Sequence, residues 1–336
     1  MPLSASLPRY GAQIAGTGCV LPERRLTNAD LEKLVDTTDD WIVQRTGMRE
    51  RRIAGPGETT ASLGTIAAKR ALEDARLSPE DIDLIILGSL TPDMLTPSTA
   101  CLVQHGLGIK RHIGAFDLNA ACSGFVYSVA TAAQFIQNGS MKHVLVIGSE
   151  TLSKVIDYTD RNTCILFGDG AGAAVLSRVD DPAAGMQSFH LGANGDGAQF
   201  IQIPGGGSLH PCTATTIAEK MHYLKMNGRE VYKFAVHQMT ESLRMGMESC
   251  NLTAETVKLV VPHQVNQRVI DSATEKMGFP KEKVFINIDR YGNTSAASVP
   301  IALDEARKAG RCGNGDWIIM VAFGAGLTWA AATIKL

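Results

Sequence analysis

The 336-residue sequence lacks the patterns that mark several classes of protein. Its seven cysteines have no CxxC or other regular spacing, so they do not describe a disulfide framework or a zinc site. Reduced thiols in the cytoplasm fit better. Lys and Arg total 32 against 34 acidic residues, which leaves no general excess of positive charge for binding nucleic acid. The first 18 residues lack a basic stretch followed by an apolar core, so we expect no signal peptide and a cytoplasmic protein.

Only one apolar run approaches the length of a transmembrane helix, from Trp317 to Ile334. Gly324 and Gly326 interrupt it in the middle, and its flanks are β-branched or small. This pattern predicts two buried strands joined by a tight glycine turn, and no membrane span.

No linker and no low-complexity segment divides the chain, but a weak internal repeat is present. In the first half DLIILGSL precedes AFDLNAACSG, a helix through Gln137 and the strand HVLVIGSE. In the second half KLVVPHQ precedes INIDRYGNTSA, a helix through Lys308 and WIIMVAFGAG. The repeat predicts an α/β protein of two duplicated halves, residues 1–183 and 184–336, packed as one compact unit.

Several local signals place helix ends and loops. Thr27 and Asp30 resemble a capping box, and Asn138-Gly139 and Gly310 are expected to end the two matching helices. The helix that follows Cys122 carries few charges, so we expect it to be buried all round. Residues 185–225 have no sustained period, which predicts loops over an opening with short strands inside.

Cys122 stands where a strand-like segment ends and a helix rich in small residues begins. The first turn of a helix carries partial positive charge, so we expect the thiol to ionise more readily there and to act as a nucleophile. A buried, inert cysteine is the alternative. His263 directly follows a buried strand, and Asn293 lies in the turn that matches the Cys122 turn. Ligands of α/β sheets bind beyond the carboxyl ends of strands, so the three side chains are expected to meet.

Cysteine, histidine and asparagine together support two chemistries. In a papain-type hydrolase of thioesters or amides, histidine is the base and asparagine orients it. In a carbon–carbon condensing enzyme, both donate to a thioester carbonyl and stabilise an enolate. The papain motif around the cysteine is absent.

The sequence resembles β-ketoacyl-acyl carrier protein synthase III, the condensing enzyme that starts fatty-acid synthesis. The motifs are TTDDWIVQRTGMRERRIA, DLNAACSGF, FGDGAGAAVL, HYLKMNGREV, VPHQVNQRVI, RYGNTSAASVP and AFGAGLTW, and the likeness runs from about Ile14 to the C-terminus. The resemblance implies a thiolase-like fold, internally duplicated and layered αβαβα with two mixed sheets, and a homodimer.

By resemblance, the catalytic residues are Cys122, His263 and Asn293. Cys122 would take an acyl group from acyl-CoA, after which malonyl-acyl carrier protein loses CO2 and its carbanion attacks the acyl thioester. His263 and Asn293 would stabilise the enolate, and the Cys122 amide with one from the Gly324–Gly326 turn would form the oxyanion hole. The resemblance implies no metal and no permanently bound cofactor. A pathway-specific condensing enzyme of secondary metabolism, or a cysteine thioesterase or amidase, is the alternative.

A coenzyme A site is predicted partly from spacing. Trp41 and Arg45 are four residues apart in an expected helix, so they share a face, and an indole beside a guanidinium suits adenine and phosphate. The resemblance adds Arg161 beside Trp41 at the adenine, Arg45 at a phosphate, and Gly228 and Asn266 along the pantetheine arm.

The acyl carrier protein is acidic, so its docking surface should be basic. By resemblance, this surface comprises Gln264, Val265, Asn266, Gln267 and Arg268, with Lys233 as a second charge. Glu275 stands where some relatives have a basic residue, which leaves the extent of the surface open.

Thr96 and Phe323 are expected at the acyl pocket. Some relatives have a bulky Phe in place of Thr96, reaching across the dimer, so the small Thr predicts longer acyl primers. The run GDGAGA from Gly168 satisfies a relaxed dinucleotide-binding pattern, but strand-like residues follow it, so we reject that function.

Overall fold

A nine-stranded mixed sheet forms the centre of the computed structural model, which describes residues 9–336. Its strand order is β11-β12-β13-β8-β1-β7-β6-β4-β5. The strands of this sheet are β1 (Gly11–Val20), β4 (Leu84–Gly88), β5 (Gly114–Leu118), β6 (His143–Thr151), β7 (Asp169–Val179), β8 (Gly185–Ala193), β11 (Leu259–Pro262), β12 (Trp317–Gly324) and β13 (Thr328–Lys335). Two small ribbons pair β2 (Arg25–Thr27) with β3 (Glu50–Arg52), and β9 (Ile201–Gln202) with β10 (Lys225–Met226).

The helices divide into long ones that cover the sheet and short ones in its connections. The long helices are α3 (Thr60–Ala75), α4 (Thr99–Leu107), α5 (Gly124–Gln137), α8 (Gly228–Glu248), α9 (Gln267–Lys276) and α11 (Ser298–Lys308). The shorter ones are α1 (Asn28–Leu31), α2 (Asp39–Thr46), α6 (Arg161–Cys164), α7 (Ala214–Ala218) and α10 (Ile288–Tyr291).

The sheet consists of two parts with the same internal pairing. In β1-β7-β6-β4, as in β8-β13-β12-β11, the first two pairs are antiparallel and the third is parallel. The parallel bridge of Val260 with Val284 occupies the place that β5 takes beside β4. A single residue pair, Ala12 with Gly185, joins the parts. The two expected mixed sheets are therefore present as two parts of one hydrogen-bonded sheet.

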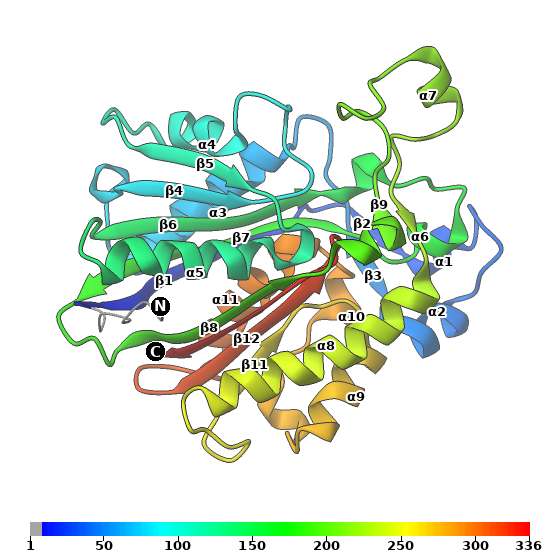
Figure 1. Cartoon of the computed structure of the whole chain (residues 1–336). Helices are drawn as coiled ribbons and strands as arrows, with labels where there is room; N and C mark the ends of the chain where they lie inside the picture. Colours follow the sequence, from blue (N-terminus) through cyan, green and yellow to red (C-terminus); the bar gives the residue numbers. More distant parts are fainter. Residues whose placement is uncertain (1–8) are drawn as a thin grey trace.

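The layers follow from the helices that contact each part of the sheet (Figure 1). Helices α3 and α4 cover the outer face of the first part, and α8 and α9 cover that of the second. Helices α5 and α11 contact strands of both parts and fill the middle layer. The expected αβαβα layering is confirmed.

The apolar sequence of the inner elements explains this arrangement. All five residues of β4 are buried, as are most side chains of α5, because both elements have protein on each side. At Gly148 in β6, a Cβ atom would lie 2.2 Å from the carbonyl oxygen of Ala296. The turn before α11 therefore packs directly on the sheet, which only glycine at this position permits.

Most local predictions are confirmed. Thr27 and Asp30 form a capping box, and Gly139 and Gly310 end α5 and α11 with positive φ. The long apolar run is the antiparallel pair β12–β13, and the GDGAGA run forms the start of β7 from Asp169 onward. Among residues 9–336, no helix combines the length and apolar character needed to cross a membrane.

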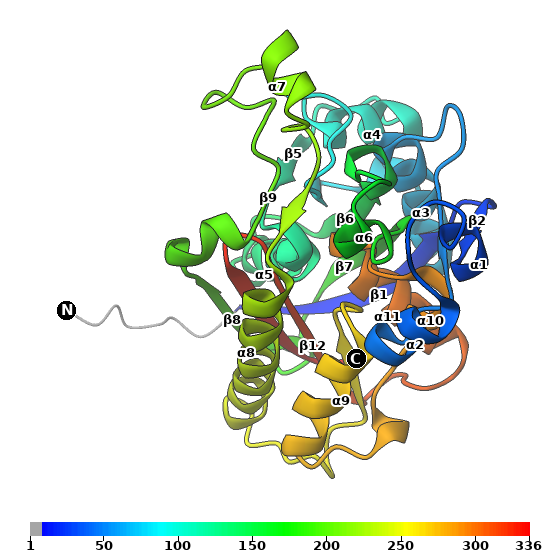
Figure 2. The same cartoon turned by 90° about the vertical axis from the view of Figure 1, so that its right-hand side faces the viewer.

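The expectation of loops with only short strands over residues 185–225 is wrong for its first part. Residues 185–193 form β8, a nine-residue strand near the centre of the sheet. Phe189 and Leu191 lie on its outward face and stay 37% and 40% exposed. The segment therefore lacks the alternation of buried apolar and exposed polar residues that would mark a strand. Pairing with β13 and β1 determines its conformation instead. Beyond β8 the chain forms β9, α7 and β10, and α7 stands away from the body (Figure 2).

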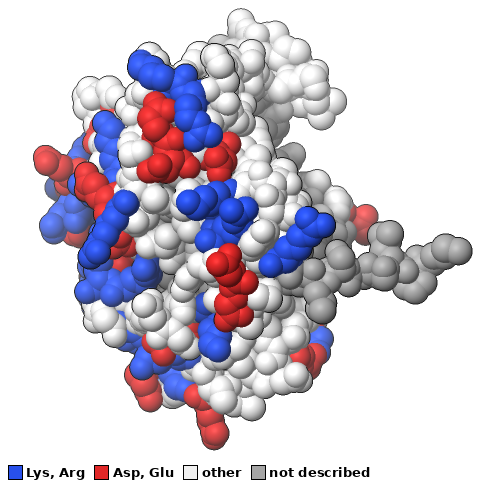
Figure 3. All heavy atoms as spheres, turned by 90° about the vertical axis from the view of Figure 1, so that its left-hand side faces the viewer, with Lys and Arg blue, Asp and Glu red and all other residues white. Residues whose placement is uncertain are grey.

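The surface charge is mixed. On the face shown in Figure 3, basic and acidic side chains are interspersed, in keeping with the net charge of −2. The expected absence of a signal peptide rests partly on residues 1–8, which lie outside the described residues.

Candidate active site

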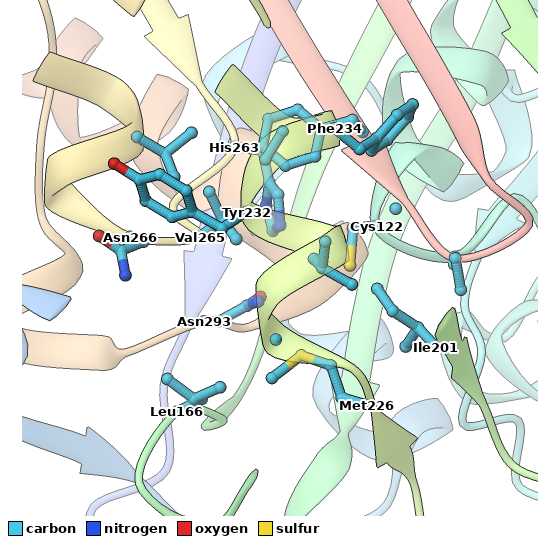
Figure 4. A pocket seen from close by; sticks show the side chains of 18 of the residues that line it. Cys122, Leu166, Ile201, Met226, Tyr232, Phe234, His263, Val265, Asn266 and Asn293 are labelled. Carbon is cyan, nitrogen blue, oxygen red and sulfur yellow. The ribbon is translucent and has the colours of Figure 1, made fainter. Parts of the chain in front are cut away.

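Three turns bring the predicted catalytic side chains to one cavity. Cys122 lies in the 3-10 turn Ala121–Ser123 before α5, His263 follows β11, and Asn293 follows α10. All three line an otherwise apolar cavity of about 100 Å³. Figure 4 shows them directed toward the same space. The expected meeting of the three residues is confirmed.

The turns before α5 and α11 have the same local structure. The side-chain oxygen of Asn119 accepts a hydrogen bond from the Ala121 amide at 3.2 Å, and that of Asn293 accepts one from the Ser295 amide at 2.8 Å. Ala121 and Ser295 have φ values of 47° and 49°. In the comparison of the two turns, the counterpart of Asn293 is therefore Asn119 and not Cys122. Non-glycine residues with positive φ are held only where the surrounding structure demands it.

The expectation that Cys122 ionises readily is wrong for this structure. Burial raises the pKa of its thiol from 9.0 to about 12, while the nearby Ser295 hydroxyl lowers it and the Glu150 carboxylate raises it further. Loss of hydration of a charged sulfur in this apolar cavity is the largest cause of the shift.

His263 is neutral and has one nitrogen free. Burial lowers the pKa of its imidazole from 6.5 to about 3. Its Nδ1 lies 2.6 Å from the Ser298 hydroxyl, whereas Nε2 has no partner among the described residues. The Phe323 ring meets the imidazole edge-on, with ring centroids 5.7 Å apart. The second nitrogen is therefore available to a bound substrate.

Asn293 is held by its backbone and by its side-chain oxygen. Its backbone N–H donates to the Leu166 carbonyl at 2.8 Å, and its backbone carbonyl accepts from the Gly168 N–H at 3.0 Å. Because the side-chain oxygen accepts from the Ser295 amide, the NH2 group is left to donate into the cavity.

The end of β12 packs directly against Cys122. A Cβ atom on Gly324 would lie 2.7 Å from the Cys122 nitrogen and 3.0 Å from its Cβ. Glycine here leaves the Cys122 amide open to the cavity.

A second cleft with cationic side chains adjoins the cavity. Within α2, the Arg45 guanidinium lies 4.5 Å from the Trp41 ring centroid, and Arg161 lies 5.3 Å from it. The predicted proximity of Trp41, Arg45 and Arg161 is confirmed. The cavity and this cleft share three lining residues, which are Gly228, Tyr232 and Asn266. The cleft therefore adjoins the cavity that contains Cys122.

The predicted carrier-protein segment divides between interior and surface. Gln264 is 1% exposed, and its amide bonds to the backbone of Pro262, Phe285 and Asn287. The side chain thus fixes the segment from inside, and a contact of Gln264 with a carrier protein stays a prediction.

The other residues of that segment reach the surface or the cavity. Val265 and Asn266 line the cavity, and Gln267 bonds Asp271 within α9. Arg268 is exposed beside Tyr232. Lys233 is also exposed and pairs with Glu230 at 2.9 Å. The positive charge of this surface therefore comes more from Arg268 than from Lys233, because Glu230 partly neutralises Lys233.

Several residues of the site were missed from the sequence. A groove between α8 and α9 contains His237 and Lys276 beside Lys233, and the outer cleft contains Arg229. Lys233 with His237, and Ser272 with Lys276, are four residues apart, a spacing that could have placed each pair on one helix face. No sequence signal pointed to Glu150 or Ser295, which lie behind Cys122.

Thr96 lies away from the cavity of this chain. It is exposed in the connection between β4 and α4 and does not line the cavity, whereas Phe323 does. A role for Thr96 depends on a second subunit and stays a prediction.

The comparisons with known proteins agree with this geometry. Two family models match the chain: 3-Oxoacyl-[acyl-carrier-protein (ACP)] synthase III over residues 116–195, and the C-terminal model of the same synthase over residues 247–336. The beta-ketoacyl-[acyl-carrier-protein] synthase III of Caldanaerobacter subterraneus subsp. tengcongensis is 53% identical over 327 residues, covering 97% of this chain and 98% of the relative. The chain belongs to the 3-oxoacyl-[acyl-carrier-protein] synthase III family.

Solved structures of relatives share the fold. The synthase III of Aquifex aeolicus VF5 has a TM-score of 0.89 and 49% identity, covering 97% of this chain and all of the relative. The priming β-ketosynthase of the R1128 polyketide biosynthetic pathway has a TM-score of 0.90 at 35% identity, with 100% and 99% covered. The resemblance seen in the sequence and its thiolase-like fold are confirmed.

Proposed function

We propose that this protein catalyses the decarboxylating condensation of an acyl-CoA primer with malonyl-acyl carrier protein, the step that initiates fatty-acid synthesis. The products are β-ketoacyl-acyl carrier protein, coenzyme A and CO2. The observation that carries the proposal is the convergence of Cys122, His263 and Asn293 on one cavity that opens into the Trp41 cleft. Family membership supports the same reaction.

In the first half-reaction, the Cys122 sulfur attacks the carbonyl carbon of the acyl-CoA thioester. Coenzyme A leaves, and an acyl group stays on Cys122. The developing oxyanion is stabilised by the Cys122 amide, which Gly324 leaves uncovered. The Trp41 cleft supports binding of the nucleotide end, because its indole and guanidinium groups suit adenine and phosphate.

In the second half-reaction, the malonyl thioester oxygen binds between His263 Nε2 and the Asn293 amide. Loss of CO2 leaves an enolate, whose negative charge both donors stabilise. Donation from Nε2 requires the Ser298 hydroxyl to turn its proton toward Nδ1. The enolate carbon then attacks the acyl carbon, and the Cys122 thiolate leaves.

The partners follow from the surfaces around the cavity. Arg268 and Lys276 on α9 are proposed to bind the acidic carrier protein, because Arg268 lines the outer cleft and Lys276 lines the groove between α8 and α9. A homodimer is proposed, with the loop that carries Thr96 reaching the partner's acyl pocket. The exposed Leu95 beside Thr96, with 87% of its surface accessible, supports such a contact.

Intact mass spectrometry tests the function. The protein is mixed with acyl-CoA and then with malonyl-acyl carrier protein. We expect an acyl adduct that Cys122→Ala abolishes without loss of fold, followed by a carrier-bound product two carbons longer. Release of free acid with no elongation would contradict condensation and support a cysteine hydrolase.

A further inference from the structure

Arg51 is a buried cation that the mechanism above does not use. It lies in β3, belongs to the same sequence motif as Trp41 and Arg45, and is 0% exposed. In the part of the chain that the structure describes it forms no ion pair, and the adjacent Glu50 carboxylate pairs with other arginines. A buried charge without a counter-charge costs stability, and an apolar side chain of similar volume would avoid that cost. The groups that Arg51 holds explain why a cation is present here.

One side of the Arg51 guanidinium holds helix α2 through Asn28. Its Nη1 donates to Asn28 Oδ1 at 2.6 Å. The Asn28 Nδ2 group donates to the Asp39 carboxylate at 2.7 Å and to the Met48 carbonyl at 2.9 Å. Asp39 is the first residue of α2, and Met48 lies directly beyond its C-terminal cap. The Asn28 side chain therefore joins both ends of the helix, and Arg51 determines which way this amide faces.

The other side of the guanidinium holds the segment that pairs with Asn293. Nη2 of Arg51 donates to the Ile165 carbonyl. Ile165 lines the outer cleft, and the next two residues, Leu166 and Phe167, line the inner cavity. The Leu166 carbonyl accepts from the backbone N–H of Asn293 at 2.8 Å, and Phe167 forms a parallel bridge with Asn293. Arg51 therefore supports the segment to which Asn293 is bonded.

The stem of the Arg51 side chain packs on two glycines beside Asn293. A Cβ atom on Gly168 would lie 3.1 Å from the Arg51 Cβ, and one on Gly292 would lie 3.4 Å from it. The N–H of Gly168 donates to the Asn293 carbonyl at 3.0 Å, and Gly292 directly precedes Asn293 in the chain. The stem therefore lies against the Asn293 turn, while the charged end bonds the groups on either side.

From this juxtaposition we propose that Arg51 is a positioning residue, which fixes α2 and the Asn293 turn relative to each other. The inference rests on the proposed function, in which α2 supplies Trp41 and Arg45 to coenzyme A and Asn293 donates to the enolate. A planar guanidinium has five N–H donors at fixed angles, so it holds two groups at a set distance, whereas a lysine ammonium on a flexible stem does not. A misplacement of about 1 Å can slow an enzyme about 100-fold.

Hydrogen exchange followed by mass spectrometry tests the bridge without any substrate. Arg51→Met removes the guanidinium and retains a long apolar side chain. We expect it to speed exchange about tenfold in a peptide that spans α2 and in one that contains Asn293, because both lose a support. Asn28→Ala should speed exchange in the α2 peptide alone, since Arg51 retains its hydrogen bond to Ile165.

Arg307→Met is the matched control. Arg307 also joins separate elements, because its Nη1 lies 3.4 Å from the Asp74 carboxylate of α3 and 3.3 Å from the Thr17 hydroxyl of β1. It lies on α11 and is not among the residues that line the cavity or the outer cleft. This variant should leave the exchange of both peptides unchanged.

Two further measurements extend the test to function, each expressed per folded site. We expect Arg51→Met to weaken coenzyme A binding about tenfold in calorimetric titration, and to slow CO2 release from malonyl-acyl carrier protein about tenfold. Asn28→Ala should weaken coenzyme A binding alone. Arg51→Lys should rescue neither quantity, because one ammonium does not hold both groups. Arg307→Met should change neither.

Three outcomes would overturn the inference. If Arg51→Met changed neither quantity per folded site, Arg51 would serve stability alone. If Arg51→Lys restored both, the charge and not the bridge would matter. If Arg51→Met changed only one quantity, the residue would serve only one of the two elements. Should Arg51→Met fail to fold, Arg51→Lys and Asn28→Ala decide, since both retain a cation at position 51.

Failure of the inference can be told apart from failure of the proposed function. A wild type that neither binds coenzyme A nor releases CO2 would contradict the proposed function, and the exchange pattern would still decide on the bridge. A fully active wild type whose Arg51→Met variant exchanges, binds and reacts in the same way would contradict the inference alone.

Discussion

His263 and Asn293 are each oriented by one neighbour that occupies one polar atom and leaves the other for a substrate. Ser298 holds Nδ1 of His263, and the Ser295 amide holds the side-chain oxygen of Asn293. Neither group is charged at neutral pH, so both serve as fixed hydrogen-bonding groups and not as bases. We therefore expect both groups to act in the step in which negative charge develops on oxygen.

This division predicts different effects on the two half-reactions. His263→Ala or Asn293→Ala should lower the rate of CO2 release and condensation by about 100-fold or more, because each removes one donor to the enolate. Acylation of Cys122, followed by intact mass, should stay measurable in both variants. If either variant blocked acylation as completely as Cys122→Ala, the assignment of these residues to the second step would be wrong.

The buried Glu150 carboxyl also predicts how stability depends on pH. Its folded-state pKa of about 7 lies above the ordinary 4.5, so its contribution to stability is present below pH 4.5 and is lost as the pH rises through 7. Glu150→Gln cannot ionise. Relative to the wild type, its free energy of unfolding should therefore improve by roughly 2.5 kcal/mol between about pH 5 and about pH 8.

Urea denaturation of both proteins at the two pH values measures this difference. His263 titrates in both proteins, so its contribution cancels in the comparison. An equal difference between variant and wild type at the two pH values would contradict the prediction.

At the scale of elements, the turn between β12 and β13 forms one wall of the site. Gly324→Ala would place a methyl group 2.7 Å from the Cys122 nitrogen, so the variant should acylate about 100-fold more slowly. Gly313→Ala is the matched control, because a Cβ atom there meets nothing within 4 Å. Single-turnover acylation compares the two variants, and equal rates would show that the turn tolerates a side chain.

The surface formed by helices α8 and α9 leads to a prediction that concerns only the reaction with the carrier protein. Arg268→Glu should raise the KM for malonyl-acyl carrier protein about tenfold, with a larger effect at low salt, because it reverses an exposed charge beside the entrance. Acylation by a short acyl-CoA should change much less. Lys69→Glu on α3 is the control, since it reverses an exposed charge on the outer layer. A similar rise of KM in both variants would contradict a specific docking surface.

The sequence predicts helices, strands and their ends well where local residue types determine them. The β12–β13 pair, the capping box at Thr27 and the ends of α5 and α11 follow from local residue types. Strand β8 could not be found this way, because its partners β13 and β1 are distant in the sequence. The burial of Gln264 was missed for the same reason, since two of its hydrogen bonds reach Phe285 and Asn287.

At the scale of the whole molecule, the paired arrangement of strands and helices supports the proposed halves 1–183 and 184–336, whose boundary falls between β7 and β8. The internal repeat predicted that Cys122, His263 and Asn293 meet. It could not predict the pKa of Cys122, because the burial that raises it comes from side chains of several elements.

The proposed dimer predicts the primer length. Thr96→Phe should slow acylation by octanoyl-CoA at least about tenfold while acetyl-CoA is used as before, because the ring would fill the partner's acyl pocket. Sedimentation should give twice the 35.9 kDa mass of one chain. A wild type that uses acetyl-CoA and ignores octanoyl-CoA would contradict the role given to Thr96.

The route shared by the outer cleft and the cavity fixes the order of events in each catalytic cycle. Under the proposed function, coenzyme A and the carrier-bound substrate both reach Cys122 past Gly228, Tyr232 and Asn266, so coenzyme A should depart before the second substrate enters. We therefore expect ping-pong kinetics, in which free coenzyme A competes with malonyl-acyl carrier protein for the acylated form.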